Sequence, residues 1–519
     1  GLNVDETSNV TAVGLTLKDN RAFFAAGLFV GHGCHGTFSN VIATGNEASY
    51  GAAIGVFVGG KPTFDTGLVS DNRALLWGAG VIVYTNAHAD FNGFAFDENQ
   101  AEIGGGIFMY SQSSASVSNS RVVSNVASKH GAGVRMDGRS ALVLTNTRVE
   151  SNVASLTGGG AHVTTGATLT LNGGEISANT AANGAGLACV GGEHGGGEII
   201  GSGVVVRENV ASGLGGGAYL TKACGATFTD TSVIDGNRAV SGSSCRALYA
   251  VGGGAFALEP NTPAAPTTLA IAGTTTVRNN TAPSGGAVFV VPAPADAATN
   301  SPRGAQITAT ASAFNDNAAV GCESTIAGRG GALFIAAGNH TFTRATIKEN
   351  TASTDGGAVY VSGVGALTMN ACDVKSNAAA RFGGAVAHVG AKLKVMGGVI
   401  ESNGAVDGGG VYIASTETST PQFALLGATL RANSATRGGA TYLATNLAAG
   451  LLRQVSHDGN TATSGADSYW LRSMSSTVEF SCVECAYAHA DGSTAGVIAT
   501  EALAMTSSAS LTERVQSGK

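Results

Sequence analysis

Short apolar stretches, separated by corners rich in glycine or asparagine, recur along nearly the whole chain and predict β-strands. Glycines lead into the first stretch of each repeat, as in GGGIFMYS from Gly104 and GGALFI from Gly330. Two further apolar stretches follow, as in GALTMNACDVKSN, where Leu367, Met369 and Val374 mark inward positions. Each repeat therefore predicts three short strands and three corners, without the periodicity of a helix.

A second motif sets the length of the repeat. It consists of an apolar residue, two variable positions, asparagine, one variable position and usually alanine. Neighbouring copies lie mostly 26 or 27 residues apart, and the longer intervals, of 28 to 43 residues, contain insertions. We interpret these asparagines as a structural ladder, in which each side-chain amide bonds its copies in the adjacent coils. They are Asn20, Asn46, Asn72, Asn99, Asn125, Asn152, Asn179, Asn209, Asn237, Asn280, Asn317, Asn350, Asn377, Asn403, Asn433 and Asn460.

This repetition predicts an all-β protein, a right-handed single-stranded parallel β-helix of about 16 coils with three short strands per coil. The glycines suit a corner that requires a positive φ or a close backbone approach, and asparagine tolerates the left-handed region. We expect the β-helix to occupy residues 1–475. Residues 476–519 are expected to form a last irregular coil followed by a C-terminal tail or short helix.

The composition is unlike that of an ordinary globular enzyme, with 77 glycines, 9 prolines and 12% charged residues among 519. The net charge of −7 gives no basic stripe, so we expect no nucleic-acid partner. We find no apolar run long enough for a membrane span. Because the first residues, GLNVDETSNV, lack the features of a signal peptide, we expect a processed or truncated piece.

Insertions fall on three consecutive coils within residues 241–331, where the asparagine spacings rise to 43, 37 and 33 residues. Seven of the nine prolines, from Pro260 to Pro302, lie there. The extra residues must leave the coil as loops, because the stack has no room for them inside. We interpret the loops as one protrusion for binding or self-assembly, with length drift in a tolerant corner as the alternative.

Two phrases of the repeat resemble those of a known family. GGAV occurs at Gly285, Gly356 and Gly383, GGAL occurs at Gly330, and FNDN ends at Asn317. Together they resemble the repeats of the chlamydial polymorphic outer membrane proteins and of related bacterial and algal surface proteins, over roughly residues 10–475. The resemblance implies a β-helix and a role as an adhesin or autotransporter passenger. Most copies have Ile, Val or Leu where that family has Phe, and no amphipathic barrel strands follow residue 475.

Candidate chemistry is sparse, and we assign no catalytic, cofactor-binding or metal-ligating residue and expect no cofactor. Acid–base work on polysaccharides requires clustered carboxylates on one face. The best column precedes the ladder asparagines, and we interpret it, like the recurring Arg21, Arg73 and Arg238, as charge on a solvated corner. Ten histidines lack metal-ligand spacing and are interpreted as isolated surface or turn residues. The acidic column comprises Asp19, Asp71, Glu98, Glu208, Asp316 and Glu349.

Eight cysteines are compatible with an oxidising compartment. Cys482 and Cys485 form a CxxC that predicts a local disulfide or two free thiols rather than zinc. The other pairings stay open: Cys224 and Cys245 lie on either side of one coil, Cys245 and Cys322 lie in comparable insertions, and Cys189 and Cys372 suit small buried positions. Glycosylation sequons occur at Asn9, Asn279 and Asn339.

Three functions fit this sequence. The first is an extracellular or cell-surface structural or adhesive rod, with self-association, other surface proteins or glycans as its partners. Because the start of the chain lacks a capping helix, we expect copies to stack end to end into a filament. The second is a pectate-lyase-like enzyme that binds or cleaves polysaccharides, for which loop carboxylates such as Asp296 or Glu323 would have to converge. The third is an autotransporter passenger without its barrel.

Overall fold

The structure, a computed structural model, divides into two compact units. Unit 1 comprises Gly1–Val240, Ala255–Asn261 and Ala265–Ala270, and unit 2 comprises Ser241–Gly254, Thr262–Ala264 and Ile271–Lys519. The described residues are 1–192, 195–240, 251–261, 265–292, 304–322, 328–390, 392–414, 422–444, 449–464, 468–470, 480–483, 486–488 and 497–499.

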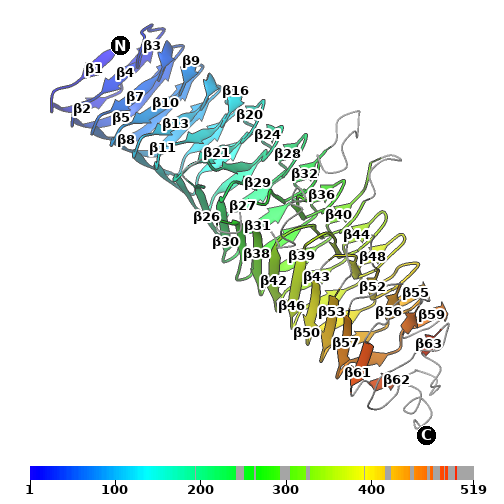
Figure 1. Cartoon of the computed structure of the whole chain (residues 1–519). Helices are drawn as coiled ribbons and strands as arrows, with labels where there is room; N and C mark the ends of the chain where they lie inside the picture. The colour runs from blue at the N-terminus through cyan, green and yellow to red at the C-terminus, as the bar shows by residue number, and fades with distance from the viewer. Residues whose placement is uncertain are drawn as a thin grey trace. The chain divides into compact units, whose positions relative to one another are not determined.

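Within each unit, short strands stack in parallel rows, and each row continues from one coil to the next (Figure 1). The described part of the chain contains strands and no helix, so none of it can span a membrane as an apolar helix. These features confirm the predicted all-β parallel solenoid of about sixteen coils. Each coil contributes to three sheets, which we name A, B and C. Its path in sheet B is usually broken into two strands, so that a coil has four short strands rather than the predicted three.

The strands of unit 1 belong to all three sheets, and its last strand, β34, ends at Ile271, the first residue of the main segment of unit 2. Sheet A contains β1 (Leu2–Val4), β4 (Leu28–Val30), β7 (Ile54–Phe57), β10 (Val81–Tyr84), β13 (Ile107–Tyr110), β17 (Val134–Met136), β21 (Ala161–Thr164), β25 (Leu187–Val190), β29 (Ala218–Thr221) and β33 (Phe256–Leu258). Sheet B contains β2 (Asn9–Val13), β3 (Thr16–Lys18), β5 (His35–Thr44), β8 (Lys61–Ser70), β11 (His88–Asp97), β14 (Ser114–Ser118), β15 (Arg121–Val123), β18 (Ala141–Thr145), β19 (Arg148–Glu150), β22 (Thr168–Asn172), β23 (Glu175–Ser177), β26 (Glu198–Ser202), β27 (Val205–Arg207), β30 (Gly225–Thr229), β31 (Val233–Asp235) and β34 (Thr267–Ile271). Sheet C contains β6 (Glu47–Tyr50), β9 (Arg73–Trp77), β12 (Gln100–Ile103), β16 (Val126–His130), β20 (Val153–Ala154), β24 (Thr180–Ala181), β28 (Val210–Ala211) and β32 (Arg238–Ala239).

The strands of unit 2 follow the same order. Sheet A contains β37 (Val288–Val290), β41 (Leu333–Ile335), β45 (Val359–Val361), β49 (Val386–His388), β52 (Val411–Ile413), β56 (Thr441–Leu443), β60 (Ser468–Trp470) and β63 (Val497–Ala499). Sheet B contains β35 (Thr276–Arg278), β38 (Ala305–Thr310), β39 (Ala313–Asn315), β42 (Asn339–Thr343), β43 (Thr346–Lys348), β46 (Ala366–Asn370), β47 (Asp373–Lys375), β50 (Lys392–Met396), β51 (Val399–Glu401), β53 (Gln422–Leu426), β54 (Thr429–Arg431), β57 (Ala449–Arg453), β58 (Ser456–Asp458), β61 (Phe480–Val483) and β62 (Ala486–Ala488). Sheet C contains β36 (Thr281–Ala282), β40 (Ala318–Ala319), β44 (Thr351–Ala352), β48 (Ala378–Ala379), β55 (Ser434–Arg437) and β59 (Thr461–Ser464).

Short strands are also present after residue 475. β61 and β62 pair in parallel with β57 and β58, and β63 pairs with β60. These strands lie within residues 476–519, where the sequence predicted a last irregular coil. Val497–Ala499, placed in a helix or tail from the sequence, is a strand because its backbone extends sheet A in register.

Side chains alternate along each strand, so that every second residue enters the interior. In β18, Leu142 and Leu144 are buried, and they lie in register with Leu169 and Leu171 of β22. In the first coils the interior column is aromatic: the rings of Phe38 and Phe64 stack at 5.1 Å between centroids. The core is thus a set of columns of like residues, which is why the sequence repeats its apolar pattern.

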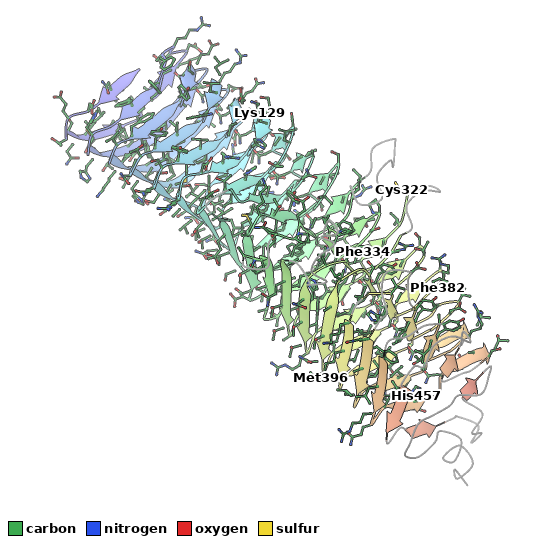
Figure 2. All side chains as sticks on the ribbon, viewed as in Figure 1. Lys129, Cys322, Phe334, Phe382, Met396 and His457 are labelled. Atoms are coloured by element: carbon green, nitrogen blue, oxygen red, sulfur yellow. A yellow bond between two sulfur atoms is a disulfide. The ribbon has the colours of Figure 1, made fainter. Side chains whose placement is uncertain are left out.

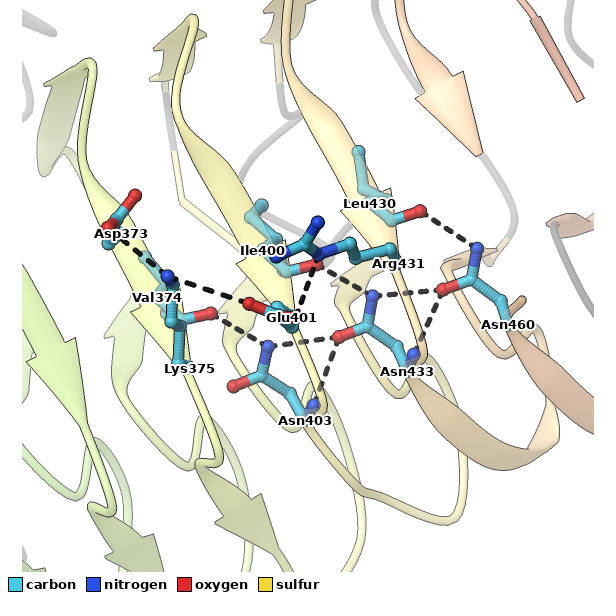
Figure 3. Close-up of polar contacts among 10 residues, drawn as sticks. All are labelled: Asp373, Val374, Lys375, Ile400, Glu401, Asn403, Leu430, Arg431, Asn433 and Asn460. Carbon is cyan, nitrogen blue, oxygen red and sulfur yellow. Dashed lines mark hydrogen bonds and ion pairs between the residues drawn. The ribbon is translucent and has the colours of Figure 1, made fainter. Parts of the chain in front are cut away.

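The ladder asparagines are buried or partly buried, and successive asparagines bond each other within each unit. In Figure 3, Asn403 donates from its backbone nitrogen and from Nδ2 to Oδ1 of Asn433, at 3.1 and 2.9 Å. Asn433 bonds Asn460 in the same way, at 3.0 Å for both contacts. Each Nδ2 also donates to a carbonyl of the adjacent coil, for example Ile400 for Asn433. The same pattern links Asn20 through Asn237 in unit 1.

The left-handed residue at this corner is not the asparagine, as the sequence suggested, but the residue before it. Glu98 and Ser124 have φ of 57° and 55°, whereas the ladder asparagines do not have positive φ. The side chain of the asparagine turns inward while the preceding side chain points to solvent. The corner before sheet A needs glycine for two reasons, a positive φ and a close backbone approach. Gly356 has φ of 69°, and a Cβ on Gly357 would lie 2.2 Å from a carbonyl of the next coil.

Candidate binding surface

The outer face of sheet A in unit 1 carries two columns of side chains in register. Because β10 and β13 direct Val81, Val83 and their partners inward, the intervening residues face outward. The first column begins with aromatic and apolar residues and then becomes polar: Phe29, Gly55, Ile82, Phe108, Arg135 and His162. The second column consists of Phe57, Tyr84 and Tyr110. Asp137 follows β17, where its nitrogen donates to the carbonyl of Met109, and Thr164 donates to its carboxylate.

Aromatic side chains from sheet A meet others from the corner with sheet C. Trp77 stacks on Phe108 at 5.4 Å, and its ring lies 5.0 Å from that of Tyr50. Phe23 and Phe24 extend the cluster and remain 62% and 49% exposed. We name this cluster the aromatic surface; it comprises Phe23, Phe24, Phe29, Tyr50, Phe57, Trp77, Tyr84, Phe108 and Tyr110.

Polar side chains continue the same face in the next coils. The hydroxyl of Thr157 lies 2.7 Å from Nδ1 of His130 and 2.6 Å from Nδ1 of His162. A hydroxyl has one proton, so it donates to one imidazole and accepts from the other. The two histidines therefore differ in which one carries the Nδ1 proton. Lys129, beside His130, reaches the exposed edge of unit 1 and pairs with Glu102 at 2.7 Å (Figure 2). We name His130, Arg135, Asp137, Thr157 and His162 the polar cluster.

Burial keeps both histidines neutral at pH 7. The pKa of His130 is lowered to about 4, mainly by burial and also by the positive charges of Arg135 and Lys129. Burial likewise holds the pKa of His162 well below its usual value, with Arg135 as the next cause. His162 points outward from β21 and is nevertheless only 2% exposed.

Arg135 is the buried cation of the polar cluster. Its side chain is 11% exposed, and Nη2 donates to Oδ2 of Asp137 at 3.0 Å. The other oxygen of Asp137 accepts from Thr164 at 2.6 Å. Nε of Arg135 is buried and has no hydrogen-bond partner among the described residues. A buried donor without an acceptor is costly to the folded state.

In unit 2, the corresponding face of sheet A is covered. Phe334 and Tyr360 are buried, and Arg329 lies over the ring of Tyr360 at 5.0 Å. Asp355, whose side chain is 4% exposed, accepts two hydrogen bonds from Arg381, each of 2.9 Å. Arg381 in turn lies 4.3 Å from the ring of Phe382, which Figure 2 labels. Ion pairs thus cover the aromatic column here. In the aromatic surface of unit 1, Phe57 and Phe108 are buried as well, but Phe23 and Phe24 are exposed and the other five rings are partly exposed.

The acidic column predicted from the sequence lies elsewhere. All six carboxylates occupy the exposed, left-handed position before a ladder asparagine, at the corner between sheets B and C. Arg21 at the same corner pairs with Glu47 at 3.1 Å and is 79% exposed. These side chains point to solvent and do not join the polar cluster. Asp296 and Glu323 lie outside the described residues.

Several histidines differ from the sequence interpretation in their burial and in their contacts. The rings of His130 and His162 approach to 5.0 Å, and His162, His340, His388 and His457 are buried. The prediction of isolated surface or turn histidines is therefore wrong for these residues. His130 and His162 occupy different positions of the repeat, so the spacing carried no signal. The aromatic surface could have been detected in the sequence, since Phe57, Tyr84 and Tyr110 recur at intervals of 27 and 26 residues.

The cysteines are also partly reassigned. Cys189 of β25 is bonded to Cys224, with their Cα atoms 5.9 Å apart, so Cys189 is not simply a small buried residue. Cys322 is disulfide-bonded as well. Cys34 and Cys372 are buried free thiols. A pairing of Cys482 with Cys485 falls outside the described side chains.

Two other predictions concern the surface. The sequon asparagines Asn9, Asn279 and Asn339 are exposed, as a glycan acceptor must be. Parts of the insertion region 241–331 lie outside the described residues, and its proposed role as a protrusion stays a prediction.

Comparison with known proteins supports the repeat. A family model for the right handed beta helix region matches residues 1–192, which lie in unit 1 and include the aromatic surface and the polar cluster. The match agrees with the parallel coils and with the right-handed sense predicted from the sequence. No curated protein matches the chain.

Proposed function

We propose that this protein is a non-enzymatic β-helix that works outside the cell as an adhesive or structural protein and holds its ligand on the outer face of sheet A in unit 1. The aromatic surface carries this proposal. Rings of Phe, Tyr and Trp that remain partly exposed on a soluble protein are the side chains most enriched at binding hot spots. Phe23 and Phe24 are 62% and 49% exposed, although the interior offers buried aromatic columns.

Other features support an extracellular setting. The Cys189–Cys224 disulfide suits an oxidising compartment, and the exposed sequons suit a glycoprotein. The repeat phrases resemble those of chlamydial-type polymorphic outer membrane proteins, which are surface adhesins and autotransporter passengers. Assembly of copies into a filament is a further proposal, and electron microscopy of the full chain at several concentrations tests it.

A polysaccharide-cleaving enzyme is the second candidate, and the polar cluster is the observation that favours it. Glycoside hydrolysis needs two carboxyl groups facing the scissile bond. The cluster supplies Asp137, whose oxygens already accept from Arg135, Thr164 and the nitrogen of Gly138. Its histidines are neutral and weakly basic at pH 7. These properties suit binding better than proton transfer.

Adhesion assays with the full chain test the proposal. The double variant Phe23→Ser/Phe24→Ser removes the most exposed rings, and Val13→Ser is a matched control because Val13 is 71% exposed on sheet B. We expect the double variant to bind cells or extracellular matrix of the source organism at least about tenfold more weakly, as for the loss of hot-spot residues. Equal binding by all three proteins would contradict the proposal. Release of reducing ends from a polysaccharide would instead favour the enzyme.

A further inference from the structure

We propose that the polar cluster is an acid-sensitive switch that regulates the aromatic surface. While the two histidines are neutral, Thr157 links them and the corner between sheets C and A stays closed. When both are protonated, the corner opens and the adjacent aromatic rings lose their support. The regulation rests on the proposed function, because the binding that it controls takes place at the aromatic surface. The opening of the corner does not depend on that function.

The shared hydroxyl of Thr157 makes the closed corner depend on the charge of both imidazoles. Nδ1 of His130 and Nδ1 of His162 lie 2.7 and 2.6 Å from this hydroxyl. One imidazole donates to it and the other accepts from it, so a proton added to the donating ring leaves both bonds intact. A second proton makes both rings donors, and the hydroxyl must then turn its own hydrogen away from the cluster. These hydrogen bonds therefore accommodate one proton but not two.

The groups that face the histidines oppose the second proton. Arg135 lowers the pKa of both imidazoles, and Lys129 lowers the pKa of the one beside it. The nearby carboxylates are already engaged: Asp137 pairs with Arg135 at 3.0 Å, and Glu102 pairs with Lys129 at 2.7 Å. The next coil presents Asn183, which has no charge, in register with the threonine. Two imidazolium ions would therefore add repulsion between like charges without gaining a free carboxylate.

The corner is packed too tightly to hydrate a charged imidazole without movement. His162 is almost completely buried. A Cβ on Gly158 would lie 2.6 Å from Cβ of His162, and a Cβ on Gly131 would lie 2.8 Å from Cβ of Arg135. The backbone thus turns directly over the side chains of the cluster. Because a buried charge is costly without water or a counter-ion, the corner has to open before the second charge can be hydrated.

The opening reaches the aromatic surface through two neighbours of the polar cluster. Ile103 lies in register with His130 on one side and with Trp77 on the other, and it packs against the cluster of rings that contains Phe108. Arg135 lies in register with Phe108, on which Trp77 stacks. Movement of His130 and Arg135 therefore removes support from Trp77 along both paths.

Acid is the direction in which the switch opens. An imidazole in an open corner titrates near its ordinary pKa of about 6.5, whereas the pKa of His130 in the closed corner is about 4. The stability that the neutral form gives to the closed corner is present above about pH 6.5 and is lost as pH falls toward about 4. Between pH 7.5 and pH 4.5, the titration of His130 alone raises the ratio of open to closed corners about 70-fold.

Hydrogen exchange of the full chain at pH 7.5 and pH 4.5, followed by mass spectrometry, tests the switch. Peptides that cover residues 129–135 and 156–162 report the corner, where the nitrogen of Gly131 donates to the carbonyl of Thr157 at 3.0 Å. After correction for the intrinsic pH dependence of exchange, we expect their protection to fall about 70-fold or more at pH 4.5. The protection of β30, which contains no histidine, should fall much less.

The double variant His130→Asn/His162→Asn keeps an amide group near each Nδ1 and cannot be protonated, so its corner should lose little protection in acid. If this variant does not fold, His130→Asn alone serves, because it should retain only the part of the response that is due to His162. His88→Asn is the control, since His88 contacts Ser114 and lies outside the polar cluster. An equal loss of protection in the unaltered protein and in the folded asparagine variant would overturn the inference.

Adhesion measured at the same two pH values separates the switch from the proposed function. We expect acid to weaken binding by the unaltered protein at least severalfold more than binding by the asparagine variant. If the corner opens while both proteins respond equally to acid, the corner does not control the aromatic surface and the inference fails. If the corner opens but the unaltered protein adheres at neither pH, the adhesive function is wrong and the acid-sensitive corner stands.

Discussion

At the scale of single residues, the ladder asparagines are the positions at which one atom satisfies several buried groups. Oδ1 of Asn125 accepts from the nitrogen and Nδ2 of Asn99, both at 3.0 Å. Nδ2 of Asn125 donates to Asn152 and to the carbonyl of Phe96. No other side chain supplies two donors and a doubly accepting oxygen in this volume. This is the physical reason why asparagine recurs in every coil.

We predict that Asn125→Ala lowers the free energy of unfolding by about 3 kcal/mol or more, since each orphaned buried group costs ~1–3 kcal/mol. Asn119→Gly is the control. Asn119 is an exposed corner residue with φ of 50°, which glycine adopts freely, and its side chain donates one hydrogen bond to Asn92 at 3.0 Å. Urea unfolding followed by circular dichroism measures both. A change below about 1 kcal/mol for Asn125→Ala would show that the ladder adds little stability.

Buried histidine makes stability depend on pH. Burial lowers the pKa of His340 to about 4, so the folded state holds the imidazole neutral while the unfolded chain titrates near 6.5. The stability contributed by the neutral form is present above about pH 6.5 and is lost as pH falls toward about 4. The loss for such a shift is about 3 kcal/mol per histidine. His388 behaves in the same way, with a pKa of about 4.

We predict that His340→Leu moves acid unfolding to lower pH. The side chain of His340 points into the interior, in register with Ile307 and Leu367 of the adjacent coils. Leucine at this position would therefore pack among apolar side chains of similar size. At pH 7.5 the variant should be within about 1 kcal/mol of the unaltered protein, because it loses one hydrogen bond to Ala337 and gains apolar burial. The exposed His35→Asn serves as control. Identical acid midpoints for His340→Leu and the unaltered protein would rule out His340 as a source of acid sensitivity.

At the scale of elements, the corners decide how closely coils stack. A Cβ on Gly384 would lie 2.3 Å from the carbonyl of Gly409 and 2.6 Å from the nitrogen of Gly404, both backbone atoms that cannot move away alone. Gly404, in the same unit, has open space around its Cβ position and no positive φ. Its partners in the adjacent coils are Ala378 and Ser434, which already carry side chains.

These two glycines form a matched pair. We predict that Gly384→Ala destabilises unit 2 by about 2 kcal/mol or more through overpacking. Gly404→Ala should be neutral, or stabilising by up to about 1 kcal/mol, because it reduces the freedom of the unfolded chain. Thermal unfolding of the two variants measures the difference. Equal effects would mean that the coil spacing adapts to an added methyl group.

The elements were predictable from the sequence because each one repeats in register. One strand slip would move every apolar side chain to the wrong face, so the pattern fixes the register. The polar cluster was not predictable in this way. His130 lies at the sheet C corner and His162 on the outer face of sheet A, and only the folding of one coil over the next brings them together. The Cys189–Cys224 bond joins non-equivalent positions of adjacent coils for the same reason.

At the scale of the whole molecule, a solenoid gains stability from contacts between neighbouring coils. A disulfide between two coils therefore adds a covalent constraint to a region that is otherwise held by these local contacts alone. The Cys189–Cys224 bond closes a loop with a sequence separation of 35. For a loop of this length, the chain-entropy model gives about 4 kcal/mol of stabilisation. The bond lies in unit 1, several coils beyond the aromatic surface.

We predict that the double variant Cys189→Ala/Cys224→Ala unfolds more easily by about 4 kcal/mol, while Cys34→Ala, at a buried free thiol, has a smaller effect that reducing agent does not change. Thermal unfolding with and without a reductant separates the two. The unaltered protein should lose stability on reduction and approach the double variant, because removing the constraint and removing the cysteines free the same coils. If reduction leaves the unfolding midpoint unchanged, the disulfide is not what holds these coils together, and the proposed oxidising compartment loses its main support.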